Sequence, residues 1–154
     1  MRDDKYRYTK LGLRNSLLSL IPFVSIFSLV PGIFFSGIIG KVLNNCELGY
    51  SISMWICLFL TVFLIWKRFK IIGTYENITS EKELKQEFTQ YSLGIYTLVN
   101  TALCILILGP GLACHGDGQS IMVVIFSGPL SSMGILLLGI FADLKIWTIA
   151  HKNA

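Results

Sequence analysis

Four uncharged stretches, each long enough to cross a lipid bilayer as a helix, divide this sequence of 154 residues. A membrane-spanning helix needs about 20 predominantly apolar residues, because the hydrocarbon core is about 30 Å thick. None of the stretches alternates as a strand does, and none is apolar on one side only, as a soluble amphipathic helix is. They predict an all-α membrane protein, a bundle of four transmembrane helices. We place the spans at residues 15–40, 48–66, 91–114 and 119–142.

The charged residues are too few to coat a soluble fold. They make up 14% of the chain, against roughly 25% in an average soluble domain. A soluble all-α core, the alternative, would therefore lack a polar surface, and we treat residues 1–154 as a single integral membrane domain. The first apolar run is longer than the roughly 7–15 residues typical of a signal peptide, and no A-x-A site follows it, so we expect a retained anchor.

The basic residues favour one orientation in the membrane. Twelve of the 13 Lys and Arg residues fall in the N-terminal segment, the loop 67–90 and the C-terminal segment, and only Lys41 lies in the first loop on the other side. Cytoplasmic loops carry the excess of Lys and Arg. We therefore expect both termini and the loop 67–90 in the cytoplasm of a bacterial cell, and the protein in its inner (plasma) membrane. Because these residues form no single patch, we expect the lipid bilayer as a partner and no nucleic acid.

The cytoplasmic loop carries a helix-start signal. In "SEKE", Ser80 fits an N-cap and Glu83 the third helical position of a capping box. Glu81 and Lys85 form a favourable i,i+4 pair. We expect a helix that begins near Glu81 and continues without a break into the third span. The charged face of this helix is either exposed to solvent, as the surface of a helical stem, or a docking surface for a partner.

The stretch "GPGLACHGDGQS", residues 109–120, combines turn residues with metal-ligand types. We expect its Gly-Pro-Gly set to end the third span and its later glycines to allow a tight reversal. Cys114, His115 and Asp117 are too few and too irregularly spaced for a common zinc site. We therefore predict a structural turn, no metal and no cofactor. With no nucleophile–base pair recognisable in the sequence, we also predict that the protein is not an enzyme.

Two of the four cysteines are expected on the outer side. Cys46 and Cys114 could form a disulfide there in an oxidising compartment. Cys57 and Cys104 fall at mid-depth and are expected to pack as small apolar residues. A thiol oxidase would need a C-x-x-C pair, and the sequence contains none.

The first three spans carry no charged residue, which argues against a proton-coupled pump. We interpret Asp143 and Lys145, at the inner end of the fourth span, as interfacial. Small and hydroxyl residues spaced four apart let helices approach closely. They form these pairs: Ser28 with Gly32, Ser36 with Gly40, and Ser127 with Ser131.

Asn100 and Thr101 lie at the middle of the third span. A buried amide in hydrocarbon needs a hydrogen-bond partner. Asn100 and Thr101 therefore predict contacts between helices or, alternatively, contacts with a substrate. Pro31 and Pro129 are expected to interrupt the first and fourth spans. Two interrupted helices at similar depth can form a transporter's binding site, although kinks are also common in membrane helices.

Taken together, these features predict a small non-catalytic inner-membrane protein that acts within the bilayer by helix–helix interaction. We expect a protective role, either immunity to a membrane-active toxin or exclusion of a superinfecting phage. The four-span outline is similar in topology, though in no motif, to immunity proteins against pore-forming bacteriocins. Two alternatives remain: a small oligomeric transporter or channel, and a subunit or assembly factor of a larger membrane complex. The expected partner is a membrane protein or a second copy of the chain.

Overall fold

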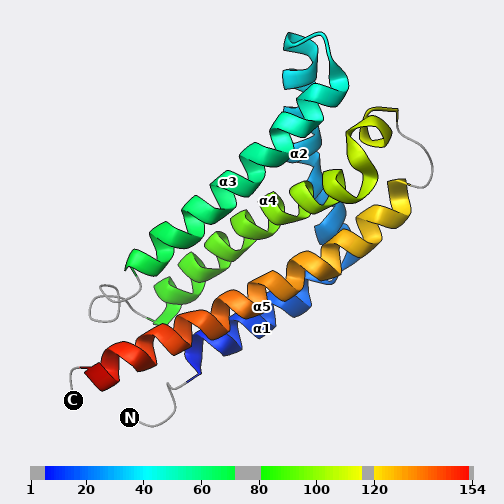
Figure 1. Ribbon diagram of the computed structural model, residues 1–154. Coiled ribbons are helices and arrows are strands. Elements are labelled where there is room, and N and C mark those ends of the chain that lie inside the picture. The colour runs from blue at the N-terminus through cyan, green and yellow to red at the C-terminus, as the bar shows by residue number, and fades with distance from the viewer. Residues whose placement is uncertain (1–5, 72–80, 116–119, 153–154) are drawn as a thin grey trace.

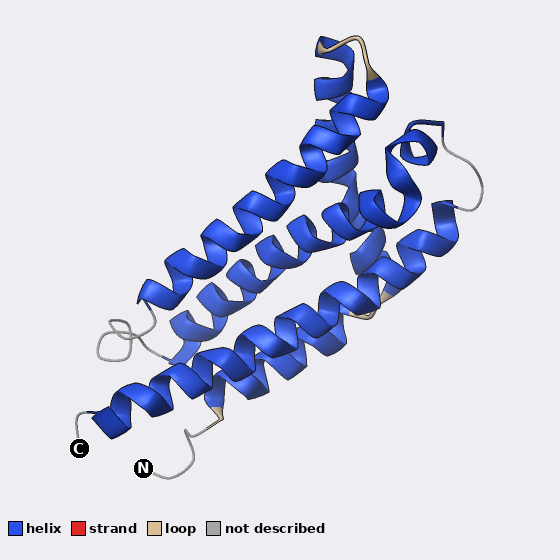
Figure 2. Ribbon diagram, viewed as in Figure 1, coloured by secondary structure: helices blue, strands red, loops and turns tan. Residues whose placement is uncertain are grey.

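The computed structural model describes residues 6–71, 81–115 and 120–152. Figure 2 shows that the described residues are helical apart from short turns. The five helices are α1 (Arg7–Ser19), α2 (Pro22–Val42), α3 (Cys46–Ile71), α4 (Glu81–His115) and α5 (Ser120–Lys152).

Four segments of these helices are long and apolar enough to cross a membrane. They are Phe23–Val42, Cys46–Lys70, Lys85–His115 and Phe126–Thr148. For the described residues, the prediction of an all-helical chain with four apolar helices long enough to span a membrane is therefore confirmed.

The first predicted span is two helices instead of one. Residues 15–40 were expected to form a single helix, but α1 ends at Ser19 and α2 begins at Pro22. Proline disfavours the helical conformation in the residue before it, and Ile21 is extended, with φ −65° and ψ 122°. Proline itself suits the first helical position, where no N–H is needed. The membrane-length helix therefore starts at Pro22, and α1 is a separate element.

The start of α1 is capped by a residue from the other end of the chain. Asp143 of α5 accepts hydrogen bonds from the backbone N–H groups of Tyr8 (3.1 Å) and Thr9 (2.7 Å). These are orphan donors of the first helical turn, and α1 has no side-chain cap from Tyr6. Asp143 was interpreted from the sequence only as interfacial, and the structure shows that it joins α5 to α1.

Helices α1 and α5 also approach closely through two glycines. A Cβ atom on Gly139 would lie 2.6 Å from the backbone oxygen of Tyr8 and 3.3 Å from Cα of Gly12. Only glycine permits this separation, since no side chain intervenes. The contact holds α1 along α5, as Figure 1 shows.

Helix α4 begins at Glu81, as predicted, but it is not a straight rod to its end. Gly109 has φ 74° and ψ 150°, and a helical segment then continues to His115. The Gly-Pro-Gly set therefore ends the first helical segment, as predicted, and a second, short segment follows it, because glycine adopts the positive φ and Pro110 can then start the next turn. Ser80 of the expected capping box lies outside the described residues.

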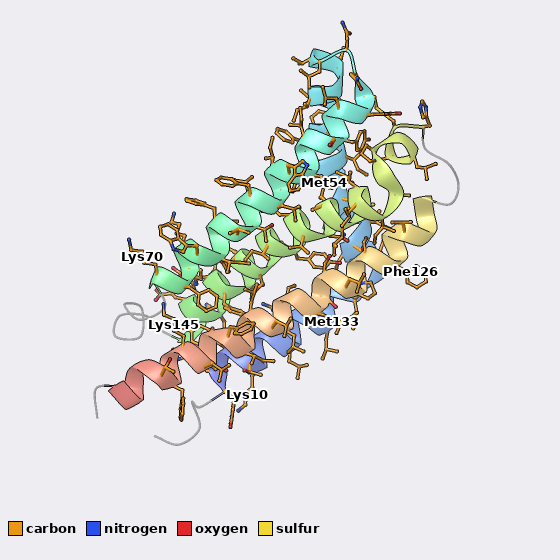
Figure 3. The ribbon with its side chains drawn as sticks, in the orientation of Figure 1. Lys10, Met54, Lys70, Phe126, Met133 and Lys145 are labelled. Atoms are coloured by element: carbon orange, nitrogen blue, oxygen red, sulfur yellow. A yellow bond between two sulfur atoms is a disulfide. The ribbon has the colours of Figure 1, made fainter. Side chains whose placement is uncertain are left out.

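The helices are arranged so that the lysine-rich segments share one end. In Figure 1, α1 begins, α3 ends, α4 begins and α5 ends at the same end of the molecule, and the α2–α3 turn lies at the opposite end. Figure 3 shows Lys10, Lys70 and Lys145 toward the first of these ends. We call it the basic end.

Candidate functional site

Hydroxyl and amide groups of α2, α4 and α5 form a buried polar seam between the helices. Each of its members is less than a tenth exposed. The members are Ser25, Ser28, Ser36, Tyr96, Asn100, Thr101, Ser127 and Ser131.

Asn100 of α4 is the centre of this polar seam. It is fully buried, and its Nδ2 donates to Ser28 Oγ at 2.7 Å and to the backbone oxygen of Ser25 at 3.1 Å. Within the described part of the chain, its Oδ1 has no hydrogen-bond partner. The amide thus joins α4 to α2, which supports the prediction of a contact between helices. Ser25 was not singled out from the sequence, because its role depends on what faces it.

The small residues of α2 let this contact form. A Cβ atom on Gly32 would collide with the side chain of Thr101, so α4 packs directly on the α2 backbone there. Thr101 directs its own hydroxyl to the Thr97 oxygen of its helix, at 2.8 Å. Ser36 likewise donates to the Gly32 oxygen, at 2.8 Å. These groups therefore serve packing within the chain.

Gly40 at the end of α2 packs against α3 instead. A Cβ atom on Gly49 would collide with the Gly40 backbone. The predicted pairs on α2 are thus divided between two neighbouring helices. On α5, Ser127 is fully buried, and Ser131 donates to its backbone oxygen at 2.8 Å.

The two prolines do not interrupt their helices. Pro31 lies inside α2 and Pro129 inside α5, and each helix continues on both sides. A proline removes one backbone hydrogen bond but leaves the flanking turns intact, so it bends a membrane helix without ending it. The observed breaks, at Ile21 and Gly109, lie elsewhere. Interrupted helices at Pro31 and Pro129 are therefore not found.

Tyr96 is a member of the polar seam that the sequence analysis missed. Its ring is fully buried, and its hydroxyl donates to the Ser19 backbone oxygen at 3.1 Å, at the end of α1. A Cβ atom on Gly128 would lie 3.2 Å from the same hydroxyl. Tyr96 therefore lies where α1, α4 and α5 meet. A tyrosine within an apolar run was the available signal, because its hydroxyl needs a partner when buried.

Cys46 and Cys114, the two cysteines expected on the outer side, are brought together. Cys46, the first residue of α3, and Cys114, near the end of α4, form a disulfide with Cα atoms 5.9 Å apart. Cys57 and Cys104 are free and buried. The disulfide ties the segment after the Gly109 break to the start of α3.

Metal-ligand residues do not cluster in the described part of the chain. Among residues 6–71, 81–115 and 120–152, no group of three or more His, Cys, Asp or Glu side chains could hold a metal ion. His115 ends α4 and is exposed. Asp117, the third ligand-type residue of the turn, lies outside these ranges.

The described residues form an all-helical fold with four helices long and apolar enough to span a membrane, and buried polar groups join its helices. Comparison with known proteins adds no relative: no protein family, no curated protein and no solved structure matches the chain.

Proposed function

We propose that this protein is a four-helix bundle of a bacterial inner membrane, with both termini and the loop 67–90 in the cytoplasm. Twelve of the 13 Lys and Arg residues support this orientation. The starts and ends of the helices agree with it, because the elements that carry these residues meet at the basic end (Figure 1).

We infer further that the protein is non-catalytic and protective, giving immunity to a membrane-active toxin or excluding a superinfecting phage. The observation that carries this proposal is the exposed face of α2. Phe23, Phe27 and Phe34 are each at least 70% exposed, and Val30 between them is 56% exposed. We call these four residues the outer face of α2. Large aromatic side chains at helical spacing can anchor a partner helix in the bilayer.

A partner helix would contact the outer face of α2 and not the paired Ser residues. Ser28, Ser36, Ser127 and Ser131 are buried inside the chain and are not accessible to a toxin helix. A partner within the bilayer would meet apolar side chains instead. Association in lipid then depends on van der Waals packing and shape.

The test is survival of a bacterial host that expresses the chain when it is challenged with a panel of pore-forming toxins and phages. We expect protection against one agent with nutrient uptake unchanged. Phe27→Ala combined with Phe34→Ala should abolish protection while membrane levels of the protein stay the same. The matched control combines Trp55→Ala with Phe59→Ala on α3, residues that are 64% and 72% exposed, and it should still protect.

Three outcomes would count against the protective role. If the chain protected the host against none of the agents, the protective role would be contradicted. Solute flux in liposomes containing only the purified protein would favour a carrier or channel. Recovery of the chain in a fixed complex with a large membrane assembly would favour a subunit or assembly factor.

A further inference from the structure

A cavity at the basic end lies between the start of α1 and the C-terminal part of α5. Its volume is about 310 Å³, and its lining combines a carboxylate, a hydroxyl, two large aromatic rings and two aliphatic side chains. The lining residues are Tyr6, Thr9, Ile140, Asp143, Leu144 and Trp147. We call it the terminal cavity. Tyr6 and Trp147 are 59% and 47% exposed, so the cavity opens to the outside of the protein between two aromatic side chains.

The carboxylate of Asp143 lies at the wall of the terminal cavity. Its oxygens accept hydrogen bonds from the backbone N–H groups of Tyr8 and Thr9, which places them at the first turn of α1, beside the side chains of Tyr6 and Thr9 that line the cavity. Asp143 is half-buried, so a ligand in the cavity can reach it. A carboxylate has about four lone-pair sites. After the two backbone hydrogen bonds, about half of them remain for a ligand.

Asp143 also lacks a cationic partner among the residues that the structure describes. It is the only Asp or Glu residue in α1 or α5. The nearest cation in its own helix, Lys145, lies over the ring of Phe69, 5.8 Å from the ring centroid, and so faces α3. The start of α1 supplies only about half a unit of positive charge. The terminal cavity therefore presents negative charge to a ligand.

The aromatic rings of Tyr6 and Trp147 add a second attraction for a cation. An ammonium group over the face of such a ring is held by the ring quadrupole. A carboxylate between two aromatic side chains therefore selects an ammonium group and disfavours a phosphate. A primary ammonium can also donate hydrogen bonds to Asp143 and to the hydroxyl of Thr9, whereas a quaternary ammonium has no hydrogen to donate.

The surroundings of the terminal cavity match the remainder of an aminophospholipid. Lys10 is exposed and follows Tyr6 by four residues, so it lies on the same side of α1, where it can pair with a phosphate. Further from the basic end, Leu13 and Leu137 are 49% and 51% exposed and follow the same sides of α1 and α5. The order is thus carboxylate, cation, apolar surface. An aminophospholipid has the complementary order of ammonium, phosphate and acyl chains.

We propose that the terminal cavity binds a primary ammonium group, carried by an aminophospholipid of the leaflet at the basic end. The ammonium donates to the carboxylate of Asp143 between the side chains of Tyr6 and Trp147. The phosphate lies at Lys10, and the acyl chains continue toward Leu13. The residue that caps α1 therefore also selects the lipid headgroup. This inference rests on the proposed insertion in a membrane and not on the protective role.

The test compares two lipids that differ only at the ammonium hydrogens, which are methyl groups in phosphatidylcholine. The purified full-length protein is mixed with equal amounts of phosphatidylethanolamine and phosphatidylcholine of the same acyl chains, and bound lipid is counted by native mass spectrometry. We expect about three- to tenfold more phosphatidylethanolamine bound, as one charge-assisted hydrogen bond at a half-exposed site would give. Asp143→Asn keeps an acceptor for the cap but removes the charge, and it should remove this preference. The control Glu87→Gln, at a carboxylate that pairs with Arg68, should keep it.

Tyr6→Leu combined with Trp147→Leu is a second variant, which removes both rings and retains the carboxylate. It should lower the binding of both lipids several-fold, because both ammonium groups lose their aromatic contacts. Equal binding of the two lipids by the unmodified protein would overturn the proposal, and so would a preference that survives Asp143→Asn. Displacement of the lipid by millimolar free ethanolamine would overturn the assignment to a lipid. No toxin or phage enters the measurement, so its outcome is independent of the protective role.

Discussion

At the scale of single residues, Asn100 has a clear energetic role. Its amide is fully buried and bonds to Ser25 and Ser28 of α2. Hydrogen bonds between membrane helices contribute about 0.6 kcal/mol on average and up to about 1.7 kcal/mol. We expect Asn100→Ala to destabilise the protein by about 1 kcal/mol in detergent-induced unfolding. Thr61→Val is the control, because that hydroxyl bonds only to Cys57 of its own helix. An equal loss in both variants would contradict the role of Asn100.

A second prediction at this scale concerns the carboxylate of Asp143. Asp143→Ala removes the acceptors for Tyr8 N and Thr9 N, and losing a helix cap costs about 0.5–2 kcal/mol. We expect these two amides to exchange hydrogen faster, measured by hydrogen–deuterium exchange in micelles. Asp143→Asn retains one acceptor oxygen and should show a smaller effect. Unchanged exchange in Asp143→Ala would exclude capping by α5.

At the scale of elements, the contact between α1 and α5 depends on the absence of a side chain at Gly139. In Gly139→Ala the new Cβ would lie 2.6 Å from the backbone oxygen of Tyr8, which cannot rotate away. Overpacking of this kind costs about 1–3 kcal/mol. Gly134→Ala, also on α5, is the matched control, because nothing lies within 4 Å of its Cβ. We expect lower stability for the first variant and no loss for the second, both measured by detergent-induced unfolding.

Many of the helices could be predicted from the sequence, and each prediction that failed has an identifiable cause. The uncharged runs predicted four helices of membrane length, because charge is so costly in lipid that its absence marks a span. The division of the first span into α1 and α2 before Pro22 was missed, because an apolar stretch of sequence looks the same whether it forms one helix or two. The breaks expected at Pro31 and Pro129 did not occur, because a helix tolerates one lost hydrogen bond. The partners of Asn100 and Tyr96 lie 72 or more residues away and follow only from packing.

At the scale of the whole molecule, the disulfide offers a test of orientation. Cys46 and Cys114 are bonded at the end opposite the basic end, and Cys57 and Cys104 are buried. In intact bacteria, we expect a membrane-impermeant reductant followed by an impermeant maleimide to label two cysteines. Cys46→Ser with Cys114→Ser should remove the label. Labelling that required opened cells would contradict the proposed orientation.

The contact of α5 with α1 through Asp143 and Gly139 has a consequence for biosynthesis. A ribosome makes α1 before α5, so the carboxylate that caps α1 does not exist until the intervening helices have been made. Until then, the amides of Tyr8 and Thr9 must be satisfied by water or headgroups at the membrane surface. The nascent chain can therefore cap the start of α1 only after α5 has left the exit tunnel. Truncation before Gly139 should leave α1 open to proteases, even though the three preceding apolar helices are already made.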